Sequence, residues 1–186
     1  MITKKHVHGL FLNATPAFID ELATELQGKK VLEIFAGNGF LANELSLRGV
    51  DVKATSILSS MDGHDVNLYC EVENIDAIEA VHKYGASHDV LLMSFPTVTE
   101  SAIKAVFEWG EARDVVYIGE RSTRTEHQQG FLAGCASDSL HYSLIEHKRF
   151  STYETTSPIK MAIRGKFDRT KLAEFLIDNN GCHYWC

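Results

Sequence analysis

Hydrophobic residues along this chain follow two alternating patterns, one typical of helices and one typical of buried strands. In segment 15–28, apolar side chains such as Phe18, Leu22 and Leu26 recur every three or four positions and would share one face of a helix. Segment 29–35 is instead a short, nearly continuous apolar run, as expected for a strand that is buried on both faces. The chain is therefore predicted to open with a helix and a buried strand.

The same alternation continues to the last third of the sequence. Further strands are predicted at 50–56, 66–74, 88–95 and 114–120, and further helices at 40–49, 75–85, 97–110 and 126–137. Two strand-like segments then follow each other directly, at 141–150 and 157–167, and a helix at 168–181 closes the pattern. Because parallel strands need crossover connections, we predict an α/β fold: a three-layer, doubly wound, mostly parallel seven-stranded sheet with a C-terminal antiparallel hairpin.

Length and composition restrict the class of protein. A chain of 186 residues is most simply one domain, 1–186, with an N-terminal arm at 1–14. The N-terminal segment lacks a long apolar stretch and no run approaches the length of a membrane span, so we expect a cytoplasmic protein that does not bind membranes. A formal charge of -7 argues against a nucleic-acid partner. Oligomerisation through the edge of the hairpin stays open.

Cysteine and histidine residues near the C-terminus raise the question of a metal site. Cys182, His183 and Cys186 lie close together in the sequence GCHYWC. A zinc site needs a second pair of ligands, and the sequence has none at a familiar spacing. We therefore expect no metal site in this protein.

The turn after the first predicted strand is the best candidate for a binding site. In open parallel sheets, ligands bind beyond the carboxyl ends of the strands, near the point where the strand order reverses. In the sequence EIFAGNGF, Gly37 and Gly39 allow a sharp turn and a close approach of the backbone to a ligand. The dinucleotide fingerprint is not complete, because Ala42 stands at its third glycine.

Segment 31–56, VLEIFAGNGFLANELSLRGVDVKATS, resembles the first motif of class I S-adenosylmethionine-dependent methyltransferases. In that motif an apolar strand and an acid precede Gly-x-Gly-x-Gly. Glu33 matches the acid, Gly37 and Gly39 match the second and third glycines, and Phe35 replaces the first. The order of strands and helices agrees along nearly the whole chain. The resemblance implies a Rossmann-like methyltransferase fold and S-adenosylmethionine as the cofactor.

The resemblance also implies roles for individual residues. Backbone amides would meet the carboxylate or sugar region of the cofactor at Ala36, Gly37, Asn38 and Gly39. Glu33 would orient the turn or reach the cofactor's amino group through water. Ser56 stands where a carboxylate usually accepts the ribose hydroxyls. A neutral hydroxyl there would weaken ribose binding by about 1–2 kcal/mol.

Two further positions each have two interpretations. Asp76 matches the acid that commonly meets the adenine amino group, but it is equally suited to complement the dipole at a helix N-terminus. The ring of Phe35 either packs between sheet and helix or lines the cofactor pocket, since FAG resembles the turn of DNA cytosine-5 methyltransferases. That subclass is excluded, because it needs a Pro-Cys nucleophile where this chain has Pro96 and Thr97, and because no room is left for a target-recognition domain.

The end of the fourth predicted strand would lie beside the transferred methyl group. Ser94, Phe95 and Pro96 loosely resemble the Asp/Asn/Ser-Pro-Pro-aromatic motif of amino-group methyltransferases, in a different order and with one proline. They either orient a substrate or form a strand-to-helix turn in which Pro96 rigidifies the exit and Phe95 is core. Proximity supplies most of the acceleration in methyl transfer. If a base is needed, Glu120 is the first candidate, followed by His127.

The sequence therefore predicts an S-adenosylmethionine-dependent methyltransferase that acts on a small molecule or a protein group. Phe35 and Ser56 depart from the family pattern, so a non-catalytic binding module with the same fold is the alternative. An enzyme that uses the same cofactor for another reaction, such as cleavage, is a third possibility. An NAD-dependent oxidoreductase is disfavoured, because no acid or arginine suited to the ribose follows at the expected place.

Overall fold

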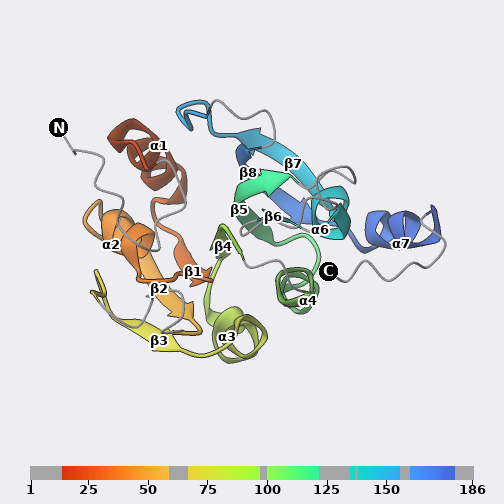
Figure 1. Ribbon diagram of the computed structural model, residues 1–186, viewed down its shortest axis with the longest axis horizontal. Coiled ribbons are helices and arrows are strands. Elements are labelled where there is room, and N and C mark those ends of the chain that lie inside the picture. The colour runs from red at the N-terminus through yellow and green to blue at the C-terminus, as the bar shows by residue number, and fades with distance from the viewer. Residues whose placement is uncertain are drawn as a thin grey trace.

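In the computed structural model, a central sheet separates two layers of helices (Figure 1). The structure describes residues 14–58, 67–96, 100–121, 135–136, 138–155 and 160–178. In chain order the elements are α1 (Pro16–Leu26), β1 (Lys30–Ile34), α2 (Phe40–Ser46), β2 (Asp51–Ser56), β3 (Val72–Asn74), α3 (Ala77–Tyr84), the 3-10 turn η2 (Gly85–Ser87), β4 (Val90–Ser94), α4 (Ser101–Trp109), β5 (Asp114–Arg121), β6 (Cys135–Ala136), α6 (Asp138–Ser143), β7 (Leu144–Arg149), β8 (Lys160–Phe167) and α7 (Arg169–Asp178). Among these residues, no helix is long and apolar enough to cross a bilayer.

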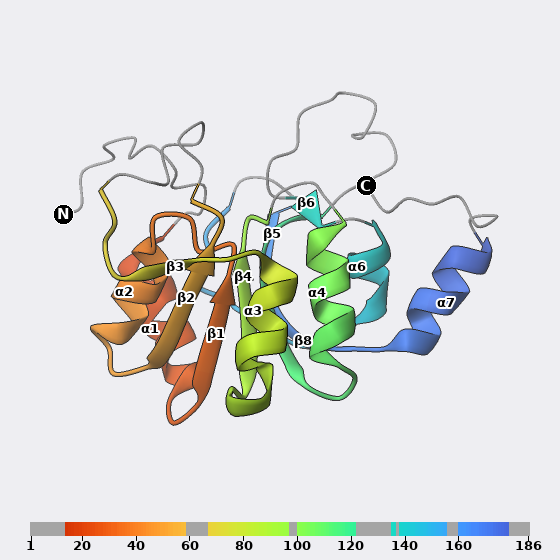
Figure 2. The same cartoon turned by 90° about the horizontal axis from the view of Figure 1, so that it is seen from below.

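The strand order confirms the predicted architecture. Along the sheet the order is β3-β2-β1-β4-β5-β8-β7, and the short β6 pairs with β5 off this path. The first five strands pair in parallel, whereas β8 is antiparallel to both β5 and β7. The chain moves outward from β1 to β2 and β3 and then returns to β4, so the strand order reverses between β1 and β4. Figure 2 shows the arrowheads of β1 and β2 directed to the same edge of the sheet.

Burial on both faces explains the continuous apolar runs of the central strands. In β4, Leu91 and Met93 pack toward α3, α4 and α6, whereas Val90 and Leu92 pack toward α1 and α2. None of these four side chains is accessible to solvent. A strand covered by helices on both sides needs apolar residues at every position, as the sequence pattern indicated.

Two predicted boundaries were wrong at the edge strands. The strand predicted at 66–74 begins only at Val72, because Tyr69 and Cys70 hydrogen-bond to the turn after β1 instead of to a neighbouring strand. The strand predicted at 141–150 begins only at Leu144, because α6 extends to Ser143. The hydroxyl of Ser143 donates to the carbonyl of Leu140, a bond within the helix that the strand interpretation missed.

The helix predicted at 126–137 is also wrong at its end. Cys135 and Ala136 pair with β5 as the strand β6, and all other residues of that segment lie outside the described part of the chain. Helix α4 begins at Ser101, and residues 97–99 of the segment predicted as this helix lie outside the described residues. The predicted N-terminal arm, His127 and the Cys182–Cys186 segment lie outside them as well, apart from Ala14.

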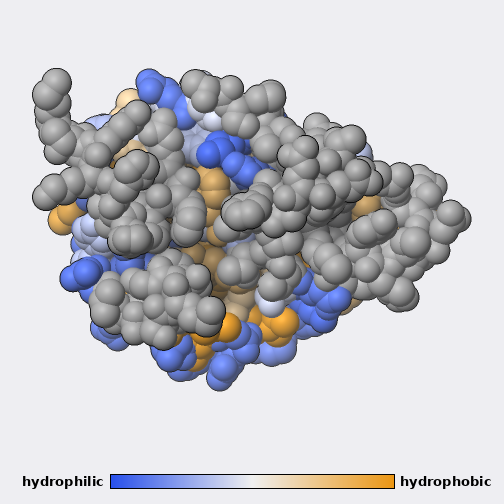
Figure 3. All heavy atoms as spheres, viewed as in Figure 1, coloured by the Kyte–Doolittle hydropathy of each residue, from blue (hydrophilic) through white to orange (hydrophobic). Residues whose placement is uncertain are grey.

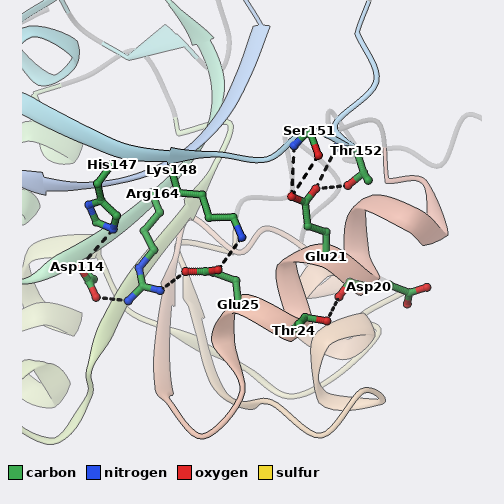
Figure 4. A network of polar contacts seen from close by, with 10 residues as sticks. All are labelled: Asp20, Glu21, Thr24, Glu25, Asp114, His147, Lys148, Ser151, Thr152 and Arg164. Atoms are coloured by element: carbon green, nitrogen blue, oxygen red, sulfur yellow. Dashed lines mark hydrogen bonds and ion pairs between the residues drawn. The ribbon is translucent and has the colours of Figure 1, made fainter.

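A polar network joins α1 to the C-terminal hairpin (Figure 4). Arg164 of β8 forms ion pairs with Glu25 of α1, at 2.5 Å, and with Asp114 of β5. Lys148 of β7 reaches the same Glu25 at 2.6 Å, and His147 lies 3.9 Å from Asp114. Because the side chain of Arg164 is only 12% exposed, this charge depends on its two acidic partners rather than on water.

We expect Arg164→Leu to lower the free energy of unfolding by about 2–4 kcal/mol, because the two acids would keep their charges in a largely buried position. The comparison variant is Arg149→Leu in the neighbouring strand, whose side chain is 55% exposed and paired with Glu146. For that variant we expect a loss of less than about 1 kcal/mol. Urea denaturation followed by circular dichroism measures both, and equal losses would contradict the importance of the buried network.

Candidate functional site

The candidate site lies where the carboxyl ends of β1 and β4 meet, at the reversal of strand order. The two strands pair in parallel, with Ile34 opposite Met93, so the segments that follow them start side by side. Figure 3 shows the face of the molecule onto which these strand ends open, and apolar residues reach the surface in its middle. The sequence predicted this location from the glycine turn and from the rule that ligands bind where the strand order of a parallel sheet reverses.

The turn after β1 is held together by hydrogen bonds from its own amides. Ala36 donates to the carbonyl of Thr55 at 3.0 Å, Gly37 donates to the hydroxyl of Ser56 at 3.2 Å, and Gly39 donates to the carbonyl of Ala36 at 2.9 Å. Three of the four amides predicted to meet the cofactor are therefore already bonded within the chain. These bonds make the turn a preformed, rigid structure. Of the four amides predicted to meet the cofactor, the amide of Asn38 is the one left to do so.

The second glycine of the turn is required by packing inside the protein. Gly39 has a φ of 78°, and a Cβ atom placed there would lie 2.7 Å from both the sulfur of Cys70 and a methyl group of Val72. The carbonyl of Asn38, which is 3% exposed, accepts a hydrogen bond from the amide of Tyr69. Residues 69–72 thus brace the turn from outside, a contact that the sequence analysis did not predict.

Glu33 is buried directly beneath this turn. Its side chain is 1% exposed, and the backbone amide of Ala42 in α2 hydrogen-bonds to its carboxyl group. No described group donates to its Oε2 atom. Burial raises the pKa of Glu33 to about 8, although the bond from Ala42 opposes this shift. The carboxyl is therefore largely protonated at neutral pH and would ionise beside a cation.

Ser56 supports the turn instead of facing solvent. Its side chain is 7% exposed, and its hydroxyl accepts the Gly37 amide hydrogen across the β1–β2 pair. The next residue, Ile57, is 63% exposed at the carboxyl end of β2 and was missed by the sequence analysis. An apolar residue that follows directly after a buried strand was the available signal, and its side chain offers a contact surface for a flat apolar ring.

Asp76 caps helix α3. Its Oδ1 atom accepts hydrogen bonds from the amides of Ile78 and Glu79, both at 2.9 Å, which satisfies two of the donors at the helix N-terminus. This geometry confirms the interpretation of Asp76 as a helix N-terminal acid. A contact with an adenine amino group remains a prediction for the same carboxylate.

Two phenylalanines adopt the left-handed backbone conformation at the ends of the paired strands. Phe35 follows β1 with a φ of 58°, and Phe95 follows β4 with a φ of 49°. This conformation costs about 1–3 kcal/mol for a residue with a side chain and tends to occur at functional sites. The ring of Phe35 packs toward α3 and α4, whereas the ring of Phe95 packs toward α1 and α2. Both rings are only partly buried.

The structure brings an unpredicted lysine to the end of β4. Pro96 is buried and Ser94 is half-buried, so the exposed part of this strand end is small. Glu120 of β5 lies beside it and forms an ion pair with Lys160 of β8, whose Nζ atom is 3.3 Å from Oε1. The same Nζ atom lies 5.8 Å from the centre of the Phe95 ring. The predicted candidate base is therefore held by a cation.

Comparison with solved structures shows that the chain has the class I S-adenosylmethionine-dependent methyltransferase fold. Magnesium protoporphyrin IX methyltransferase from Synechocystis PCC 6803, solved with bound S-adenosylmethionine, is 12% identical, with a TM-score of 0.51 over 81% of this chain and 78% of that one. MtNAS, solved as a mutant in complex with S-adenosylmethionine, is 12% identical, with a TM-score of 0.53 over 82% of this chain and 62% of that one.

A third similar structure comes from work on the conversion of a disulfide bond into a thioacetal group during echinomycin biosynthesis. It is 13% identical, with a TM-score of 0.50 over 90% of this chain and 88% of that one. No protein-family model matches the sequence, and no curated protein matches it. The likeness therefore defines the fold and leaves the substrate open.

Glu33 makes the stability of the protein depend on pH. The folded state keeps the carboxyl proton up to a pKa of about 8, whereas the unfolded chain loses it near the ordinary value of 4.5. Its contribution to the free energy of unfolding is therefore largest below that ordinary value and falls as the pH rises toward 8. The full change is on the order of 4 kcal/mol.

We expect Glu33→Gln to remove this pH dependence, because the amide does not titrate. Urea denaturation of both proteins at pH 5, 6, 7 and 8 measures the difference, since all other titrating groups are common to the two. The Glu33→Gln variant should gain stability relative to the natural protein as the pH rises. Parallel curves for the two proteins would show that Glu33 is ionised in the folded state throughout this range.

Proposed function

We propose that this protein is a methyltransferase that binds S-adenosylmethionine at the turn after β1. The observation that carries the proposal is the buried carboxyl of Glu33 beneath a rigid glycine turn at the reversal of strand order. One of its oxygens has no hydrogen-bond partner among the residues that the structure describes. A buried carboxyl without a partner is destabilising, and a cationic ligand would compensate for it. The methyltransferase fold is consistent with this ligand.

The residues at this edge suit the different parts of the cofactor. Glu33 would balance the positive charge of the amino acid portion, and the amide of Asn38 would meet its carboxylate. Ile57, exposed at the end of β2, would pack against the adenine ring, and Asp76 follows at the end of the next strand. When bound, the cofactor supplies an electrophilic methyl group on a sulfonium centre. Phe95 and its neighbours then need only to hold an acceptor in line with it.

A binding module without catalysis is the second candidate, and one observation favours it. The hydroxyl of Ser56 is used to hold Gly37, so the end of β2 offers the ribose no carboxylate at that position. Such a site would bind the cofactor weakly. Binding without transfer to any acceptor would support this alternative.

The remaining features of the proposal follow from composition. We infer that the protein works in the cytoplasm. Its acceptor would be a small molecule or an exposed protein group, because its net charge of -7 is unfavourable for binding nucleic acid. Most of the described chain belongs to the sheet and its covering helices, which leaves little of it for a separate recognition domain. Within the described part of the chain, the acceptor would therefore be recognised at the strand ends.

Titration with S-adenosylmethionine and with S-adenosylhomocysteine tests the proposal. We expect a dissociation constant in the micromolar to low millimolar range by isothermal calorimetry. In amide NMR spectra, signals from residues 36–39 and 56–57 should shift first, while those of the distant turns at Gly28 and Gly110 should not. Glu33→Gln should weaken binding by about tenfold, the equivalent of one charged contact.

Folding of each variant is checked by the dispersion of the same spectra. No heat and no shifted signals at millimolar ligand, from well-folded protein, would reject the proposed cofactor. Signal shifts confined to a surface away from the ends of β1 and β2 would reject the proposed site but not the proposed ligand.

A further inference from the structure

A carboxylate and an aromatic ring together hold an ammonium group at the end of β4. The Nζ atom of Lys160 lies 3.3 Å from the carboxylate of Glu120 and 5.8 Å from the centre of the Phe95 ring. Both groups attract cations, the carboxylate by charge and the ring face by its quadrupole. The side chain of Glu120 is 15% exposed, so the contact is shielded from much of the competing water.

The direction of the Lys160 side chain relates this contact to the cofactor turn. Ser94 of β4 pairs with Ile118 of β5, and Glu120 pairs with Lys160 of β8, so β5 separates the lysine from β4. Neighbouring strands lie about 5 Å apart, which puts the backbone of Lys160 roughly 10 Å from β4. Its ammonium nevertheless lies over the ring of Phe95, directly after β4. The side chain therefore reaches back across one strand toward β1 and its glycine turn.

We propose that Phe95 and Glu120 form the acceptor subsite of this protein, that the subsite takes a primary amine, and that Lys160 occupies it in the absence of an acceptor. The inference rests on the proposed methyltransferase function and adds the chemical class of its substrate. The ammonium of Lys160 marks the position that the amino group of the acceptor would take.

Charge distinguishes an amine from an anionic acceptor. Glu120, whose side chain is largely buried, already neutralises the charge of Lys160 at a distance of 3.3 Å. A carboxylate or phosphate in the place of the Lys160 ammonium would therefore be repelled by the Glu120 carboxylate. An amine that replaces the Lys160 ammonium keeps both contacts and restores the same charge balance. The left-handed backbone of Phe95, whose amide donates to Ile118 at 2.7 Å, fixes the ring in the orientation that receives it.

The transfer is balanced in atoms and charge. The acceptor binds as an ammonium ion and gives one proton to Glu120, which leaves a neutral amine with a free lone pair. That lone pair would form the new N–C bond as the S–C bond of the sulfonium breaks. The cofactor leaves as a neutral thioether, and the methylated amine carries the positive charge. Glu120 finally returns its proton to water. The carboxylate thus serves first as a binding partner and then as a base.

Lys160→Met tests the subsite, because methionine keeps much of the length of the side chain and removes its ammonium. The matched control is Lys166→Met, an exposed lysine at the opposite end of the same strand. The probes are ethylammonium and, as an anion of similar size, acetate. Amide NMR titration without cofactor reports binding at residues 119–120, and mass spectrometry with S-adenosylmethionine present detects N-methylethylamine.

We expect Lys160→Met to bind ethylammonium about tenfold more tightly than the natural protein or Lys166→Met, and to form more of the N-methylated product. Adding Glu120→Gln to the first variant should abolish this gain. Equal affinity in the two methionine variants would overturn the proposal, as would acetate binding at residues 119–120 of the natural protein. A Lys160→Met protein that binds ethylammonium and S-adenosylmethionine without forming N-methylethylamine would overturn the acceptor role.

These outcomes separate the two proposals. Absence of S-adenosylmethionine binding in the natural protein would reject the proposed function, and with it methyl transfer to an amine. If only this inference fails, the natural protein binds S-adenosylmethionine, but Lys160→Met binds ethylammonium no more tightly than Lys166→Met does.

Discussion

The parallel pairing of β1 with β4 is the constraint on which the candidate site depends. Both strands are buried on both faces, so they run side by side through the core and end at the same edge of the sheet. Beyond that edge the two segments turn toward opposite faces, with Phe35 packed on one helical layer and Phe95 on the other, each at positive φ. The positions of the two turns are thus set by the core strands that precede them.

Two acidic side chains at this edge have different surroundings and therefore different chemistry. Glu33 is enclosed by the turn, lacks a partner for one oxygen and holds its proton to unusually high pH. Glu120 is paired with a lysine at the rim. An enclosed neutral acid can respond to the charge of a ligand, whereas a paired carboxylate can exchange one cation for another. The proposed transfer from a sulfonium to an amine would use both properties.

The three layers, the parallel core and the C-terminal antiparallel hairpin could be predicted from the sequence, because hydrophobic periodicity reports burial directly and crossovers restrict the topology. The glycine turn and Glu33 became candidates because they lie on one continuous segment that resembles the first methyltransferase motif. Lys160 could not be found, since its position beside Phe95 depends on the register of β8 on β5. Ser56 was assigned to the ligand because a sequence does not reveal that its hydroxyl would bond to Gly37. The shortened β3 likewise follows from hydrogen bonds of Tyr69 and Cys70 to the turn.

The ion pairs between α1 and the hairpin also bear on how the protein is made. Glu25 belongs to the first helix, but its partners Lys148 and Arg164 lie 123 and 139 positions later in the chain. During synthesis the first helix must leave the ribosome long before either cation exists, with its acidic residues in water and its apolar face uncovered. Final docking of this helix is then a late event, and a nascent chain interrupted before β8 would expose a surface that chaperones recognise.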